Sequence, residues 1–141
     1  MSLAYWRDIC ILNLPEIDEE HADLLRILKA IYQDIQIGED RHRLQSKLHL
    51  LFDSALSHCE SEERLMESYG YPDYQEHADR HEELLNTVLN LRLKAEEQDG
   101  KLTLDMLHGI VVWLNHHFWD YDLKLAQFIQ QRQHRETLLF S

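Results

Sequence analysis

The feature that most constrains the fold of this chain is an apolar stripe that recurs in four long stretches. Within each stretch, apolar residues return at alternating steps of four and three positions, which is the pattern of a helix packed against neighbouring helices. Short connections between the stretches favour neighbours that run in opposite directions. The sequence therefore predicts an all-α protein, an antiparallel up-and-down four-helix bundle with an extended N-terminal arm. The stripes run over residues Ile17–Ile35, Leu44–Tyr69, His77–Ala95 and Leu107–Phe128.

Residues that favour helix ends lie between these stripes. Glycine can close a helix in the left-handed conformation, proline cannot continue one, and Asp or Thr can accept hydrogen bonds from a first turn. We expect one domain over residues 1–141, with an arm over about 1–16, a bundle over about 17–131 and a short polar tail. In the arm, Trp6 and residues Ile9–Leu12 are available to pack on the bundle. The expected helix ends are Pro15, Asp18, Gly38, Asp40, the corner at Gly70 and Pro72, Asp73, the Gln98–Lys101 turn and Thr103.

The composition argues against several classes of function. The chain has 26 acidic and 14 basic side chains and a formal net charge of −12, whereas nucleic-acid or anionic-membrane binding needs clustered Lys and Arg. Cys10 and Cys59 are too few for a disulfide framework or a thiolate metal cage. The N-terminus lacks the apolar segment of a signal peptide, and no run approaches membrane-span length. We therefore expect a cytoplasmic protein that binds neither nucleic acid nor membranes.

Polar side chains interrupt the stripes of the first three stretches. They are His21, the pair His58 and Glu62, and the pair His77 and His81. The members of each pair are four residues apart, so they lie on one helix face, and a reversal at the corner between the pairs would make their donors face each other. A single histidine in a stripe is more often a core residue than a ligand. Five such residues, one of them a carboxylate, are costly to bury without a partner.

The fourth stretch offers two pairs of donors on different faces of its helix. They are His116 with Asp120 and His117 with Asp122. At about 100° per residue, the first pair lies far from the centre of the apolar stripe, and the second pair straddles it. We therefore predict that His117 and Asp122 point inward. Because they are five residues apart, they need either a carboxylate that reaches or a local widening of the helix.

The predicted inward set contains five histidines and two carboxylates. Imidazole-rich sites suit Fe, Zn or Cu, and seven donors are too many for one tetrahedral zinc. Two metal ions that share Glu62 and Asp122 as bridging ligands fit this number. Carboxylate-rich di-iron bundles repeat Glu-x-x-His in two helices, and these stripes hold no such pair. A nitrogen-rich set favours reversible dioxygen binding over oxygenation.

Four motifs that contain these residues resemble the hemerythrin family, and in particular its single-domain bacterial members. The resemblance extends from about Trp6 to Leu125 and implies a non-haem di-iron site with a bridging oxo or hydroxo group. The motifs are Ile17-Asp18-x-x-His21, His58-x-x-x-Glu62-Glu63-x-x-Met66, Tyr71-Pro72-x4-His77-x3-His81 and Trp113-Leu114-x-x-His117-x4-Asp122.

The resemblance also implies roles for the seven donors. One iron would bind His77, His81 and His117, and the other would bind His21 and His58, with Glu62 and Asp122 bridging the two. The iron with two histidines would keep an open position for dioxygen. The implied function is reversible dioxygen binding for storage, delivery or sensing, rather than catalysis. The alternatives are a di-iron protein that handles peroxide or nitric oxide, iron storage, and a signalling module whose protein partner the sequence does not identify.

Some residues near the expected ligands differ from the usual pattern of the family. Glu20 stands where Gln is usual, Cys59 where an aromatic residue is common, Leu84 in place of Phe, and Phe118 in place of Ile. Phe118 is a candidate for the wall of the dioxygen pocket; the other interpretation is that it fills core away from the irons. Cys59 is expected to be a small packing residue. The remaining histidines, expected at the surface, are His42, His49, His108, His116 and His134.

Overall fold

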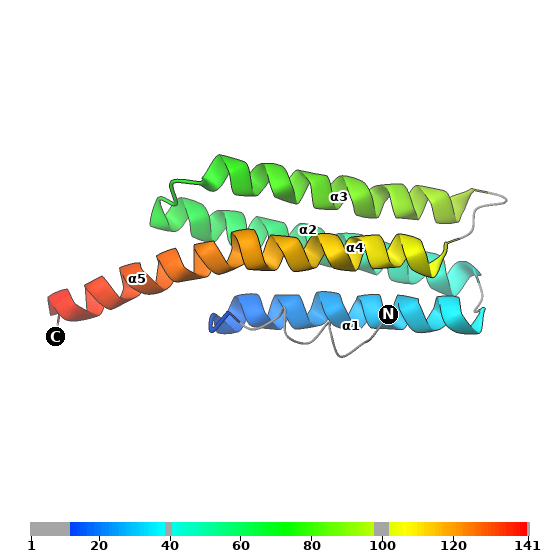
Figure 1. Ribbon diagram of the computed structural model, residues 1–141, viewed down its shortest axis with the longest axis horizontal. Coiled ribbons are helices and arrows are strands. Elements are labelled where there is room, and N and C mark those ends of the chain that lie inside the picture. Colours follow the sequence, from blue (N-terminus) through cyan, green and yellow to red (C-terminus); the bar gives the residue numbers. More distant parts are fainter. Residues whose placement is uncertain (1–11, 39–40, 98–101, 141) are drawn as a thin grey trace.

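The architecture is a bundle of four helical rods, seen in a computed structural model that describes residues 12–38, 41–97 and 102–140. The rods alternate in direction, and the fourth consists of α4, a short π-helical segment η3 and α5 in unbroken succession (Figure 1). Helices α1 and α3 each pack against both α2 and α4, so the rods surround one interior. This confirms the predicted all-α four-helix bundle. The elements are α1 Pro15–Ile37, α2 Arg41–Tyr69, α3 Tyr74–Glu96, α4 Leu104–His117, η3 Phe118–Asp122 and α5 Leu123–Phe140.

Two glycines end the first two helices. Gly38 has φ 69°, and its N–H donates to the carbonyls of Asp34 and Ile35. Gly70 has φ 63° and donates to the carbonyl of Glu67 at 3.2 Å. Both are in the left-handed conformation that glycine adopts without a steric cost. The chain therefore reverses sharply after α2, and α3 returns antiparallel to it.

The N-termini of the later helices are held in different ways. Thr103 accepts a hydrogen bond from the N–H of Met106 at 3.3 Å, as predicted for an N-cap. Asp73 precedes α3 but its side chain makes no capping hydrogen bond. Its carboxylate instead pairs with the ammonium of Lys124 at 2.6 Å, which joins the start of α3 to α5. The predicted cap at Asp40 and the turn at Gln98–Lys101 lie outside the described residues.

A layer of buried polar side chains, which includes His21, Glu62 and Asp122, divides the apolar interior into a large part and a small part. The large cluster extends from the layer towards the α1–α2 and α3–α4 connections and includes Leu28, Leu48 and Val111. Burial of each leucine in this cluster contributes roughly 1.5–3 kcal/mol, so this half contributes most of the apolar stabilisation. The small clusters, on the side of the α2–α3 corner, are Met66, Tyr71, Leu125 and Ile129, and Leu12, Ile17 and Ala126.

The buried face of the fourth rod changes register at η3. The stripe predicted beyond Phe118 continues through Tyr121, Leu125 and Phe128. Leu125 is buried, but Tyr121 and Phe128 are only half-buried. Ala126 and Ile129 are buried instead. The π segment explains the difference, because its wider turn accommodates one more residue than an α-helical turn.

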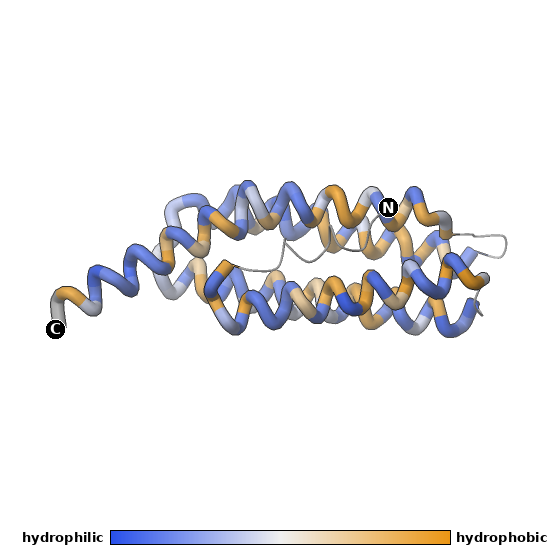
Figure 2. The backbone as a smooth tube through the Cα atoms, turned by 60° about the horizontal axis from the view of Figure 1, so that its bottom comes forward, coloured by the Kyte–Doolittle hydropathy of each residue, from blue (hydrophilic) through white to orange (hydrophobic). Residues whose placement is uncertain are grey.

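Helix α5 extends the fourth rod past the rest of the bundle (Figure 1). Its residues 131–138 are exposed, and this projecting part is largely hydrophilic (Figure 2). Leu12, from the expected arm, is buried, and its carbonyl accepts a hydrogen bond from Gln130 at 3.1 Å. The expected arm residues Trp6 and Ile9–Ile11 lie outside the described residues. Among the helices described, none combines the length and apolarity that a membrane span requires.

Candidate metal centre

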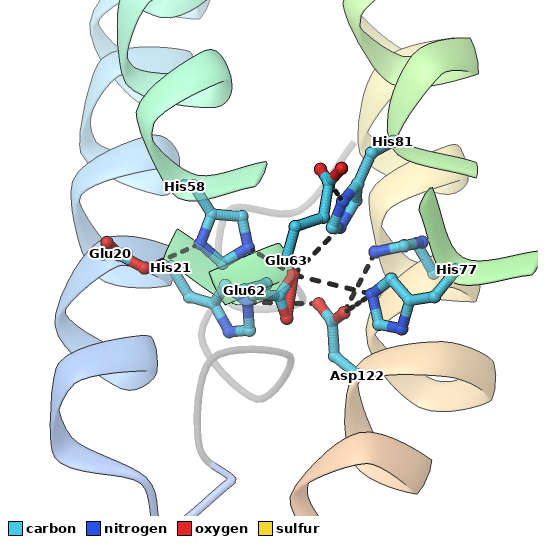
Figure 3. A network of polar contacts seen from close by, with 9 residues as sticks. Glu20, His21, His58, Glu62, Glu63, His77, His81 and Asp122 are labelled. Atoms are coloured by element: carbon cyan, nitrogen blue, oxygen red, sulfur yellow. Dashed lines mark hydrogen bonds and ion pairs between the residues drawn. The ribbon is translucent and has the colours of Figure 1, made fainter. Parts of the chain in front are cut away.

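Seven buried polar side chains converge within the polar layer of the bundle (Figure 3). Each is at most 2% exposed, and together they come from every rod. They form two groups within which the ligand atoms lie no more than 4.8 Å apart, and both groups contain Glu62 and Asp122. The structure thus brings together all the donors predicted from the sequence. The groups are Glu62, His77, His81, His117 and Asp122, and His21, His58, Glu62 and Asp122.

Glu62 is surrounded by histidines from two helices. Its Oε1 lies 3.0 Å from Nε2 of His58, one turn earlier on α2, and 3.0 Å from Nε2 of His81 on α3. The Nε2 of His77 is 3.6 Å from the same oxygen. The spacing of four residues along α2 and α3, together with the corner between them, produces this arrangement.

Asp122 reaches the centre through the π segment. The N–H of Leu123 donates to the carbonyl of Phe118, five residues earlier, so the helix is widened here. This places Oδ1 of Asp122 3.0 Å from Nε2 of His117. Of the two alternatives that the spacing allows, the structure has the local widening. The other pair, His116 and Asp120, is exposed, with side chains 66% and 65% accessible.

The two oxygens of Asp122 contact different groups of donors. Oδ1 lies 3.0 Å from Nε2 of His77 as well as from His117, whereas Oδ2 lies 3.2 Å from Nε2 of His21. One oxygen therefore faces the three-histidine group and the other faces the two-histidine group. A carboxylate in this position suits a ligand shared by two cations.

Many donor atoms in this centre make no hydrogen bond of good geometry among the described residues, although some of them lie 3.0 to 3.2 Å from a charged group. Each buried polar atom left in this way costs about 1–3 kcal/mol. Bound cations would remove that cost, because imidazole nitrogens and carboxylate oxygens are both ligands of iron and zinc. The donor set therefore fits metal ions. The atoms are both ring nitrogens of His21, His77 and His117, Nε2 of His58, Oε2 of Glu62, and both oxygens of Asp122.

The charges of the centre also favour cations. Burial by itself lowers the pKa of His58, but Glu62 and the hydrogen bond to Glu20 outweigh it and raise the pKa to about 10. In the same way, Asp122 and Glu62 overcome burial and raise the pKa of His77 to about 9. Burial would raise the pKa of Glu62, yet the neighbouring histidines hold it well below its usual value. Without metal, protons therefore balance the buried carboxylates, and metal binding would displace some of them.

Two carboxylates outside the donor set hold two of the histidines. Glu20 on α1 lies 3.0 Å from Nδ1 of His58, and Glu63 on α2 lies 3.1 Å from Nδ1 of His81 (Figure 3). Sequence reasoning did not assign a role to either glutamate. The available signal was their position directly beside a predicted donor, His21 for Glu20 and Glu62 for Glu63.

Aromatic rings cover two other histidines. The ring of Phe118 stacks on His21, with centroids 4.0 Å apart and an interplanar angle of 29°. His117 lies between Trp113 and Tyr121, with centroid distances of 5.0 and 5.5 Å and angles of 13° and 14°. Phe118 therefore contacts His21 and also belongs to the large apolar cluster, and its role as a wall of the dioxygen pocket stays a prediction.

The remaining predictions about histidine and cysteine concern residues outside the centre. The five histidines expected at the surface are exposed, and Cys59 is buried in the large apolar cluster. Burial raises the pKa of the Cys59 thiol, which suits a packing residue more than a reactive one. Cys10 lies outside the described residues. The exposed histidines are His42, His49, His108, His116 and His134.

Comparisons with known proteins agree on one family. The family model described as the hemerythrin HHE cation binding domain matches residues 13–129, which include all seven donors. A bacteriohemerythrin of Pseudomonas paraeruginosa is 28% identical over 123 residues, which are 86% of this chain and 78% of that protein. A bacteriohemerythrin of Stenotrophomonas maltophilia is 29% identical over 131 residues, 92% of this chain and 84% of that protein. One of Clostridium acetobutylicum is 26% identical over 121 residues, 83% and 94% of the two chains.

Proposed function

This chain belongs to the hemerythrin family, and from that premise we propose that it binds dioxygen reversibly at a non-haem di-iron centre. The observation that carries the proposal is the pair of donor groups that share Glu62 and Asp122. Two groups with two common carboxylates suit two ions with bridging ligands. An oxo or hydroxo group would complete the bridge. Storage, delivery and sensing of dioxygen all fit such a centre.

The proposed ligands divide unequally between the two ions. His77, His81 and His117 would hold one iron, and His21 and His58 would hold the other. Glu62 and Asp122, which belong to both donor groups, would be shared by the two ions. The ion with two histidines has fewer protein ligands, so it is the one expected to keep a position open for dioxygen.

The protein's own contribution is a dry and preorganised site. Iron, when bound, would supply the electrons for reversible binding of dioxygen. The seven donors are at most 2% exposed, so water and anions have little direct access to them. Phe118 covers one face of His21, the histidine expected beside the open position. Exclusion of water would slow the irreversible oxidation of the centre.

Metal content and the visible spectrum test the proposal. We expect about two irons per chain, in line with the paired donor groups, and a peroxide-to-iron band that appears when the reduced protein meets dioxygen and disappears when dioxygen is removed. One zinc ion per chain, with no iron, would contradict the proposal. Steady consumption of peroxide or nitric oxide without a stable oxygenated form would favour the enzymatic alternative. Accumulation of many irons per chain would favour iron storage.

A further inference from the structure

Glu20 and Glu63 form matching contacts on the outside of the candidate centre. Glu20 lies 3.0 Å from Nδ1 of His58, and Nε2 of the same ring lies 3.0 Å from Oε1 of Glu62. On the other side, Glu63 lies 3.1 Å from Nδ1 of His81, whose Nε2 is also 3.0 Å from Oε1 of Glu62. Each of these two imidazoles therefore has a carboxylate at both ends (Figure 3).

The outer contact determines which of the two ring nitrogens can act as a metal ligand. An ionised carboxylate only accepts hydrogen bonds, so Nδ1 of each ring must carry the proton that Glu20 or Glu63 accepts. With Nδ1 protonated, the lone pair of Nε2 would be the one available to a metal ion in the centre. A carboxylate on the outer N–H also makes the imidazole a stronger donor to a metal.

The other three histidines of the centre lack this support. Nδ1 of His21, His77 and His117 has no hydrogen-bond partner among the described residues. Ring stacking orients two of them instead, His21 against Phe118 and His117 between aromatic rings. His58 belongs to one donor group and His81 to the other, so each group contains a single histidine backed by a carboxylate.

The two outer contacts are partly protected from water and they join different helices. The side chains of Glu20 and Glu63 are 28% and 30% exposed. Glu20 ties α1 to α2, and Glu63 ties α2 to α3. Partial burial strengthens such contacts relative to ion pairs in open solvent. These features distinguish the two glutamates from the exposed carboxylates of the same helices, such as Glu60.

We propose that Glu20 and Glu63 are positioning residues, one for each metal position, which hold His58 and His81 with Nε2 directed at the metal. The inference rests on the proposed function in that it requires metal ions in the centre. Each glutamate supports one metal position. Loss of one glutamate should therefore weaken the binding of one metal ion and leave the binding of the other unchanged.

Zinc binding provides a test that is independent of dioxygen and of iron redox chemistry. Zinc affinity is measured by competition with a chelator in Glu20→Ala, Glu20→Gln, Glu63→Ala and Glu63→Gln. We expect each Ala variant to lose about 10- to 100-fold in affinity for one of two zinc ions. The Gln variants retain a neutral acceptor, so their loss should be smaller. The matched controls are Asp23→Asn, which changes the charge in the same opening beside Glu20, and Glu60→Gln on α2.

Nitrogen-15 NMR of the zinc-loaded protein reads the hydrogen bonds directly. We expect the Nδ1 protons of His58 and His81 to resonate further downfield and to exchange more slowly than those of the other three histidines. Glu20→Gln should shift only the His58 signal, and Glu63→Gln only that of His81. Because these variants are nearly isosteric, this measurement remains valid even where an Ala variant fails to fold.

The outcomes separate this inference from the proposed function. Two tightly bound zinc ions in both Ala variants, or equal losses in the Asp23→Asn and Glu60→Gln controls, would overturn the positioning role and leave a two-metal centre standing. Unchanged His58 and His81 signals in the Gln variants would do the same. A wild-type chain that takes up no zinc and no iron would overturn the di-iron proposal itself, and the inference with it.

Discussion

At the residue scale, helix α4 and segment η3 offer two His–Asp pairs, one of them buried and the other exposed. Substitution of His117 or Asp122 by Ala removes a buried donor, and we expect the iron content to fall by half or more. His116→Ala and Asp120→Ala are matched controls, since both side chains are about two-thirds exposed, and these variants should retain the wild-type iron content. Elemental analysis of the purified variants measures the result. Loss of iron in His116→Ala with retention in His117→Ala would contradict the proposed ligand set.

Phe118 is the residue for which the structure sharpens a prediction most. Its ring stacks on His21 at 4.0 Å, beside the position proposed for dioxygen. We expect Phe118→Ile to speed both azide binding and autoxidation, because a smaller side chain opens the cover over His21, while both irons stay bound. Stopped-flow absorbance measures both rates. Ile110→Val, another buried substitution in the large cluster, should cost about 0.5–1.5 kcal/mol of stability and leave both rates unchanged.

If Phe118→Ile behaves like the Ile110→Val control, the pocket-wall role is wrong. The variant would then lower stability by about 1 kcal/mol, as changes of shape in a core commonly do, without altering access to the centre. The assignment of the seven donors does not depend on this result.

At the scale of elements, segment η3 contains one residue more than a regular helix needs. Trp119 is 53% exposed, so its deletion would return η3 to α-helical geometry without rotating the buried face of α5. We expect the metal-free Trp119 deletion to unfold at the wild-type temperature or higher. Deletion of Val112, a matched exposed residue within regular α4, should rotate Leu107 and Ile110 out of the core. That rotation should cost about 1.5–3 kcal/mol for each side chain.

Thermal unfolding followed by circular dichroism compares the two deletions. A large loss of stability on deletion of Trp119, comparable to that of the Val112 deletion, would show that the widened turn is required for the fold.

The elements and donors of this chain could be predicted because their signals are local. Periodic stripes predicted the helices, Gly38 and Thr103 predicted helix ends, and the helical wheel separated His117 from His116. Beyond Phe118 the predicted stripe was right for Leu125 and wrong for Tyr121 and Phe128, because a strict alternation of four and three does not include the extra residue of η3. Tyr121 was therefore placed inward, whereas the structure has it half-buried.

The sequence pattern could not predict which side chains contact each other between helices. Asp73 has the right type and position for an N-cap, but Lys124 on α5 takes its carboxylate. Glu20 and Glu63 contact histidines 38 and 18 residues away. Such pairs depend on how neighbouring helices rotate about their axes, and a stripe of apolar residues defines that rotation only to within about a residue.

At the scale of the whole molecule, the buried charges predict how the stability of the metal-free protein depends on pH. The pKa values of His58 and His77 are raised to about 10 and 9, above the unfolded value of about 6.5. The contribution of these two histidines to the free energy of unfolding is fully present below pH 6.5 and is lost as the pH rises through 9 to 10. The pKa values of Glu62 and Asp122 are lowered, so their contribution is present above about pH 4.5 and is lost on acidification.

Burial lowers the pKa of His117, so this group costs stability as the pH falls below about 6.5. We therefore expect the metal-free protein to be most stable near about pH 6.5. Urea unfolding at a series of pH values measures this dependence. His58→Gln should flatten the decline on the alkaline side, whereas His116→Gln, at an exposed position, should not. If the stability of the wild type instead increased from pH 6.5 to 10, protonated histidines would not be what balances the buried carboxylates of the metal-free centre.

The uneven division of the core on either side of the polar layer implies that the two ends of the bundle differ in local stability. The half around Leu28, Leu48 and Val111 contains many more buried apolar side chains than the half at the α2–α3 corner, so the corner half relies more on the groups in the polar layer. In hydrogen exchange, stripping the metal should therefore speed amide exchange near Met66 and Tyr71 while amides near Leu48 stay protected. In a newly made chain, the corner would then remain the less protected end of the bundle until iron binds.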